Sequence, residues 1–201
     1  MKRVLTCRPD HLVLGNFGRE HLGRALEASR AIAKRVAALA GPIGLTQAAD
    51  ALPAALARCG VREKIAIVTP YFPVAEDHLQ EFARAIGYRA VRTRHLSCIG
   101  PVAIARTGEA ELRAALQAVD APEVEAIIQF GANLPMARLA AEAEQWLGKP
   151  VIAVNVATYW HALRSIGNRR PTAGLRPAAC GVLRRPRTRM RRRRIRATVR
   201  R

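Results

Sequence analysis

Residues 64–86 read KIAIVTPYFPVAEDHLQEFARAI, and this stretch decides the fold. Lys64–Thr69 is a short apolar run closed by Pro70, a pattern typical of a buried strand. The segment from Val74 to Ile86 then carries apolar residues at helical spacing. A strand followed at once by a helix is the repeating unit of a parallel sheet covered by helices, so the stretch predicts an α/β protein.

The same alternation runs regularly from Lys64 to Asn155 and can be followed toward the N-terminus. Runs of β-branched and apolar residues predict strands at His11–Phe17, Lys64–Thr69, Arg89–His95, Ala126–Phe130 and Val151–Asn155, with a weaker sixth at Ile43–Thr46. Stretches of helical period predict helices at Arg19–Ala40, Thr46–Cys59, Val74–Ile86, Glu109–Val119, Met136–Leu147 and Ala157–Ile166.

Charge is distributed unevenly along the 201 residues. The chain has 34 basic and 15 acidic residues, a formal net charge of +19, but its last acidic residue is Glu144. Residues 169–201 contain 14 arginines, no acidic residue and no periodicity able to bury a face. We expect residues 168–201 to be a disordered Arg/Pro-rich tail or the product of a frameshift, because GC-rich DNA read out of frame encodes such residues.

Composition also limits the class of protein. Half of the residues are hydrophobic, which excludes a wholly disordered or collagen-like chain. Neither a secretory signal nor an apolar stretch of about 20 residues is visible, so we expect a soluble, cytoplasmic protein without membrane association. The four cysteines stand far apart without a C-x-x-C pair, which argues against a metal site and against a disulfide framework. They are Cys7, Cys59, Cys98 and Cys180.

Ligands of parallel α/β sheets bind beyond the carboxyl ends of the strands, where helix N-termini and turns offer backbone donors. The turns predicted there contain amides, hydroxyls and glycines but few ionisable groups. They are Gly15–Gly18, Thr69–Pro73, Ser97–Pro101, Gly131–Asn133 and Asn155–Thr158. Such donors suit a small anion, for example a carboxylate, better than metal chemistry.

Two stretches carry a family resemblance: VTPYFPVAEDHLQEF at 68–82 and IIQFGANLPMARLAAEAEQWLGKPVIAVNVATYWHALRSIG at 127–167. They resemble the maleate cis-trans isomerase and arylmalonate decarboxylase branch of the Asp/Glu racemase superfamily. The resemblance implies two Rossmann-like parallel lobes with the substrate between them. Residues 1–60 would form a partial first lobe, to which a helix at 156–167 returns, and residues 61–155 the second. Because the first strand begins late for this family, we expect an incomplete first lobe and a chain that is a fragment.

The resemblance further implies a cofactor-independent isomerase, racemase or decarboxylase-like protein for a small carboxylic or dicarboxylic acid. Tyr71 would bind a substrate carboxylate. Backbone N–H groups of Gly131 and Ala132, together with the Asn16 turn, would hold carboxylate or enediolate oxygens. Asn133 and Asn155 would line the same pocket.

The chain departs from this family at the thiols. Its racemases and isomerases use two cysteines, one in each lobe, but the corresponding turns here read Gly15-Asn16-Phe17 and Phe130-Gly131. Whether the chain is an enzyme therefore stays open. Cys98 follows a predicted strand and is either a lone catalytic thiol or a small buried hydrophobe.

Several candidate residues admit two interpretations. Tyr71 is a carboxylate ligand or a rim aromatic, and the Asn133 and Asn155 turns are ligand contacts or helix caps. His95 and His161 are site residues or packing residues. The whole chain is an isomerase-like enzyme, a catalytically inactive remnant, or a protein that binds nucleic acid nonspecifically through Arg169–Arg201. Open sheet edges favour a homo-oligomer.

Overall fold

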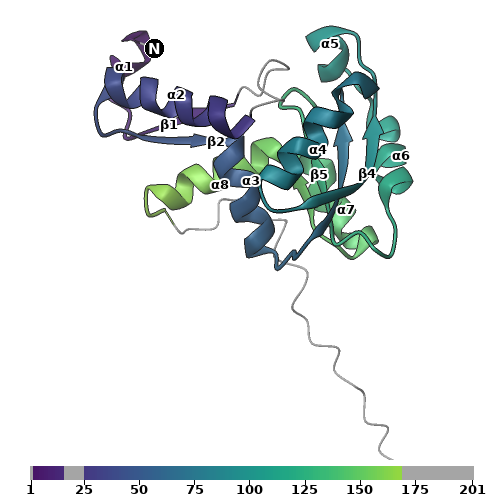
Figure 1. The fold of residues 1–201 in the computed structure, drawn as a ribbon. Helices are drawn as coiled ribbons and strands as arrows, with labels where there is room; N and C mark the ends of the chain where they lie inside the picture. The colour runs from purple at the N-terminus through teal and green to yellow at the C-terminus, as the bar shows by residue number, and fades with distance from the viewer. Residues whose placement is uncertain (1, 16–24, 169–201) are drawn as a thin grey trace, which may run out of the picture.

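The computed structural model of the chain describes residues 2–15 and 25–168 (Figure 1). Its strands are β1 (His11–Leu14), β2 (Gly44–Gln47), β3 (Lys64–Thr69), β4 (Arg89–His95), β5 (Ala126–Gln129) and β6 (Val151–Ala153). Its helices are α1 (Lys2–Leu5), α2 (Ala25–Ala40), α3 (Ala48–Arg58), α4 (Glu76–Ala85), α5 (Gly100–Ala105), α6 (Glu109–Val119), α7 (Ala137–Leu147) and α8 (Val154–Ser165), with a 3-10 turn η2 at Pro73–Ala75.

The strands form two parallel sheets. β1 pairs with β2, while the larger sheet has the order β4-β3-β5-β6. Its register places Ile65 beside Ala126 and Ile127 beside Val151. Because every pairing is parallel, the carboxyl ends of all four strands meet at one edge. This confirms the predicted α/β class with two parallel lobes.

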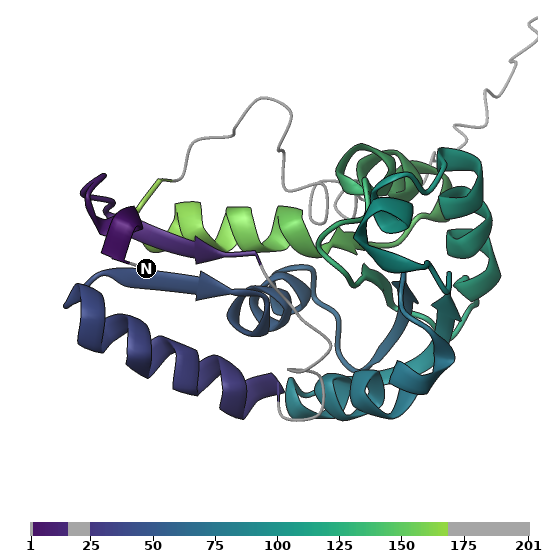
Figure 2. The same cartoon turned by 90° about the horizontal axis from the view of Figure 1, so that it is seen from above.

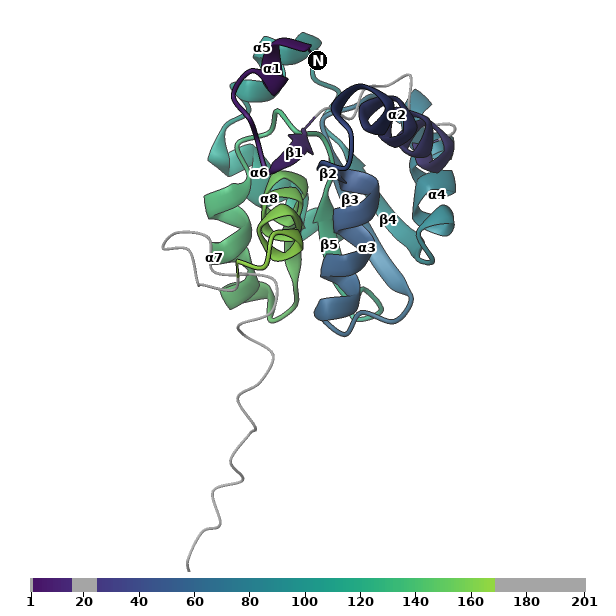
Figure 3. The ribbon, with the colours of Figure 1, turned by 90° about the vertical axis from the view of Figure 1, so that its left-hand side faces the viewer.

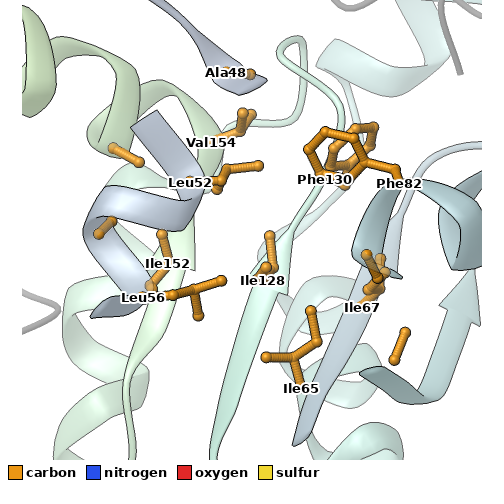
Figure 4. Packing of buried hydrophobic residues seen from close by; sticks show 14 of the residues in the cluster. Ala48, Leu52, Leu56, Ile65, Ile67, Phe82, Ile128, Phe130, Ile152 and Val154 are labelled. Atoms are coloured by element: carbon orange, nitrogen blue, oxygen red, sulfur yellow. The ribbon is translucent and has the colours of Figure 1, made fainter. Parts of the chain in front are cut away.

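Helices cover both faces of the larger sheet, as Figure 3 shows. Alternate side chains of β3 and β5 therefore enter two separate cores. Ile65, Ile67 and Ile128 pack with α3, α4 and α8, and Figure 4 shows Leu52 and Leu56 of α3 in this cluster. Ala66, Val68 and Ile127 pack instead with α6 and α7. Burial on both faces explains why these strands read as continuous apolar runs.

Helix α8 joins the two sheets. It starts directly after β6 and then packs on α3, β1 and β2 (Figure 2). On the smaller sheet, the fully buried hydroxyl of Thr46 lies 2.8 Å from Nε2 of His11 and 3.1 Å from Nδ1 of His161 on α8. His161 is thus a hydrogen-bonded packing residue between α8 and β2.

The first sheet is smaller than the second. In residues 2–15 and 25–168 it has two strands, and Val13 of β1 is 48% exposed. This agrees with the incomplete first lobe expected from the sequence. Within the same ranges, no helix combines the length and the apolar character needed to cross a membrane.

Several sequence predictions match the structure residue by residue, namely β3, β4 and α6. The last strand was predicted too long, because β6 ends at Ala153 and α8 already begins at Val154. Two short helices, α1 and α5, were missed. Both have six residues or fewer, too few for a helical period to be visible.

We predict that the fold loses stability as the pH falls from about 7 to about 5. Burial, with His161 as the smaller cause, lowers the pKa of His11 below its usual 6.5. The unfolded chain therefore takes up a proton at higher pH than the folded chain, and the free energy of unfolding rises with pH in this window. Urea titrations across the window measure the slope. His11→Gln should flatten it, whereas His78→Gln, at an exposed position of α4, should leave it unchanged; equal slopes in the two variants contradict the assignment.

Candidate functional site

Polar turns follow three strands at the carboxyl edge of the larger sheet. Pro70 and Tyr71 come directly after β3, residues 130–133 come after β5, and Asn155 lies in the first turn of α8 after β6. The segment after β4 joins them, because the N–H of Cys98 donates to the carbonyl of Pro70 at 2.9 Å. The larger sheet thus brings four separate segments of the sequence to one edge.

Gly131 packs directly on Pro70. Its φ is +113°, and a Cβ at this position would lie 2.6 Å from both Cγ and Cδ of the proline ring. The buried amide of Gln129 donates to the Gly131 carbonyl at 2.6 Å and fixes the orientation of the turn. Only glycine satisfies both the backbone angle and the close approach at this position.

The turn after β5 presents a row of backbone donors. Among the residues that the structure describes, no protein acceptor takes the N–H of Gly131, Ala132 or Asn133. The carbonyl of Gly131, by contrast, is occupied by Gln129 and by the N–H of Leu134 at 3.3 Å. Consecutive N–H groups in a turn are a type of donor set that can bind an anion.

Asn133 and Asn155 hold this turn from two sides. The side-chain amide of Asn155 donates to the Ala132 carbonyl, and that of Asn133 donates to the Pro101 carbonyl, both at 2.6 Å. Neither residue caps a helix, since the N-caps of α7 and α8 are Met136 and Ala153 and neither helix has a side-chain cap. The helix-cap interpretation is therefore wrong for both residues.

Tyr71 is half-buried against the core cluster shared by α3, α4 and α8. Its N–H donates to the Thr69 hydroxyl at 3.4 Å, and its carbonyl lies 3.2 Å from Nδ1 of His95. Nε2 of His95 lies 2.8 Å from the Glu76 carboxylate. His95 is thus next to the site, although no sequence pattern pairs it with Glu76, which is 19 residues away.

Cys98 lies beside the Pro70 turn. Its thiol is half-buried and 3.6 Å from the hydroxyl of Thr107, which itself donates to the Ala103 carbonyl. The residue before it, Ser97, has a φ of +52°, so the segment turns sharply at the end of β4. A catalytic role for Cys98 stays a prediction.

Phe130 belongs to the Phe130-Gly131 turn, where the family resemblance leads one to expect a thiol. Its side chain is 1% exposed, and its ring centroid lies 5.2 Å from that of Phe82 on α4 (Figure 4). The ring is therefore part of the core, and this position offers no titratable group. The first-lobe turn with Asn16 lies outside the described residues.

The described part of the chain contains no group of side chains suited to binding a metal ion. Within residues 2–15 and 25–168, no three His, Cys, Asp or Glu side chains are grouped so that they could hold an ion. The donors at the carboxyl edge are instead amides and hydroxyls, which suit an anion.

The arrangement defines an α/β protein with polar turns at the carboxyl edge of a parallel sheet. The family model for arylmalonate decarboxylase matches residues 23–176. The chain therefore belongs to the arylmalonate decarboxylase family. No curated protein matches the chain in sequence.

Solved structures with the same fold include isomerases and a decarboxylase. The maleate cis-trans isomerase of Nocardia farcinica bound to TRIS is 21% identical with a TM-score of 0.76, over 89% of this chain and 74% of that one. The maleate isomerase of Pseudomonas putida S16 with maleate is 20% identical with a TM-score of 0.71, over 90% and 74%. An arylmalonate decarboxylase is 24% identical with a TM-score of 0.70, over 88% and 78%. The family match supports an arylmalonate decarboxylase-like function, and the maleate isomerases share the fold.

We predict that Gly131→Ala destabilises the fold by about 2–5 kcal/mol, since the new Cβ meets Pro70 and the backbone angle is strained. Gly148→Ala is the matched control. It also has a positive φ, +67°, but open space around the Cβ, so its cost should be about 1–2 kcal/mol. Chemical denaturation measures both values, and a Gly131→Ala cost no larger than that of Gly148→Ala contradicts the close packing on Pro70.

Proposed function

We propose that the chain binds a small carboxylic or dicarboxylic acid at the carboxyl edge of the larger sheet and acts on it without a cofactor. The carboxylate oxygens accept hydrogen bonds from the N–H groups of Gly131 and Ala132 and from the hydroxyl of Tyr71. The observation that carries this proposal is the row of unoccupied backbone donors at residues 131–133.

The start of α8 supports the same ligand. The helix has no side-chain cap and no acidic residue in its first turn, so its positive dipole end is not offset there. Asn155, in that first turn, is hydrogen-bonded to Ala132, which places the helix start next to the donor row. Two sources of positive potential thus meet at one point, and a carboxylate is stabilised by both.

These donors also suit the chemistry of the family. Loss of a proton or of carbon dioxide beside a carboxylate leaves an enediolate, whose negative charge spreads onto the carboxylate oxygens. The substrate carboxylate already carries a negative charge, and the enediolate places more charge on the same oxygens. Donors fixed before the reaction therefore stabilise the enediolate more than the carboxylate ground state, and one such donor can contribute about 3–4 kcal/mol. The donor row is fixed by Pro70, Gln129 and Asn155.

The mechanism also needs a group that transfers a proton to or from the substrate. One solved relative, the Nocardia farcinica isomerase, carries a covalent succinylcysteine intermediate. In this chain the expected second-lobe position holds buried Phe130. We propose Cys98 for this role, because it is the thiol next to the Pro70 turn. To reach a substrate, the thiol must break its contact with the Thr107 hydroxyl. Because the thiol is the proposed proton carrier, Cys98→Ser should abolish turnover while leaving acid binding intact.

A binding protein without turnover is the second candidate. It is favoured by the burial of Phe130, which removes the usual thiol but not the carboxylate donors. Isomerisation of maleate, racemisation of an amino acid or decarboxylation of an arylmalonate by the purified chain rejects this second candidate. Nucleic-acid binding through Arg169–Arg201 lies outside the described residues and stays a prediction, as does self-association.

We predict that maleate, aspartate, glutamate or an arylmalonate raises the melting temperature of the chain selectively. A ligand that binds only the native state at about 100 times its Kd adds about 2.7 kcal/mol to the free energy of unfolding. Tyr71→Phe should weaken the binding of the selected acid about tenfold or more, since a hydrogen bond to a charged group is lost. Tyr159→Phe, at an exposed position of α8, is the control. Equal affinity in Tyr71→Phe and in the parent chain rejects the role of the hydroxyl.

A further inference from the structure

Glu76 and His95 form a polar pair directly behind the Tyr71 turn. Glu76 is the first residue of α4, and His95 is the last residue of β4. Nε2 of His95 lies 2.8 Å from Oε2 of Glu76, and Nδ1 lies 3.2 Å from the Tyr71 carbonyl oxygen. The side chain of His95 is only 12% exposed, so water competes little for these contacts.

The contacts decide what the imidazole can do. A carbonyl oxygen and an ionised carboxylate oxygen only accept hydrogen bonds, so both contacts are hydrogen bonds at the same time when the imidazole carries a proton on Nδ1 and on Nε2, as an imidazolium does. Both ring nitrogens are then engaged with the protein. A general base must offer one nitrogen to its substrate, which makes His95 a positioning residue and not a catalytic one.

Glu76 is itself held in place from two elements. Its Oε1 accepts from Nε2 of Gln80 at 2.7 Å and from the hydroxyl of Thr93 at 3.0 Å. Gln80 also donates to the carbonyl of Ala90 on β4. Burial alone raises the pKa of Glu76, but the hydrogen bonds from Gln80, His95 and Thr93 together lower it below its usual value. The carboxylate is therefore a fixed, ionised anchor between α4 and β4.

Both polar groups of the Tyr71 backbone, its N–H and its carbonyl, are hydrogen-bonded. Thr69 accepts from its N–H, and His95 donates to its carbonyl. These two contacts fix the peptide planes on either side of the residue and hence the direction in which its side chain leaves the chain. A ligand then meets a tyrosine that is already oriented, which lowers the entropy cost of binding.

We propose that Glu76 and His95 position Tyr71 for a small carboxylic acid, through the hydrogen bond from His95 to the Tyr71 carbonyl. This inference rests on the proposed function, because the ligand of Tyr71 is the acid assigned there. It adds two residues to the site, one of them on a helix and the other on an edge strand.

The test uses the full chain labelled with 3-fluorotyrosine, whose three tyrosines are Tyr71, Tyr88 and Tyr159. Tyr71→Phe identifies the fluorine signal of Tyr71. Without any ligand, His95→Ala and Glu76→Gln should shift or broaden this signal and leave the other two in place. His95→Asn keeps an N–H donor close to the position of Nδ1 and should restore it. His78 is an exposed histidine on α4, the helix that begins with Glu76, and His78→Ala should change none of the three signals.

The second readout is the affinity for maleate or phenylmalonate, measured by calorimetry. His95→Ala and Glu76→Gln should weaken binding about three- to tenfold, and His95→Asn should recover most of the loss. If the parent chain binds an acid but the Tyr71 signal or the affinity is unchanged in His95→Ala and Glu76→Gln, the positioning role alone is overturned. If the parent chain binds none of the acids, the proposed function fails first and the positioning role with it.

Discussion

The contact between Gly131 and Pro70 is the constraint on which the rest of the site depends. It joins the turns after β3 and β5, which are neighbouring strands of one sheet. No other residue type can occupy position 131 without moving the proline. Because Gly131 approaches so closely, the turn at residues 131–133 and the Tyr71 turn lie side by side at the same edge of the sheet.

Around this contact, each neighbouring element adds one hydrogen bond. Gln129 holds the Gly131 carbonyl, Asn155 holds Ala132, and His95 holds the carbonyl of Tyr71. Each of these side chains contacts a backbone carbonyl and none of them contacts an N–H group of residues 131–133. A rigid frame of this kind is the condition for electrostatic stabilisation of a developing charge.

Helix α8 couples this frame to the first sheet. Its first turn contacts the donor row through Asn155, and two turns later His161 meets the buried hydroxyl of Thr46 on β2. Between these two contacts, Phe130 at the end of β5 packs in the core against Phe82. The family fold is thus present, and the turn after β5 begins with a buried aromatic ring.

The sequence was sufficient for the elements whose pattern is local. The limits of β3 follow from its apolar run, and those of β4 and α6 from their local residue patterns and flanking residues. It was insufficient at β6, where VIAVN is apolar enough for either a strand or a helix start and tertiary packing decided for the helix at Val154. The caps expected at Asn133 and Asn155 failed for a similar reason, because both amides bind carbonyls distant in sequence. The partners of His95 and Gly131 were likewise visible only once the strands had been placed side by side.

The most direct test of the account is the response of the backbone amides of residues 131–133 to a small acid. On the 15N-labelled full chain, titration with maleate or phenylmalonate should move the amide signals of Gly131, Ala132 and Asn133 more than those of any other described residue, with one common saturation curve. Saturable shifts confined to other parts of the chain, with these three signals unmoved, would contradict the assignment of the donor row as the carboxylate site.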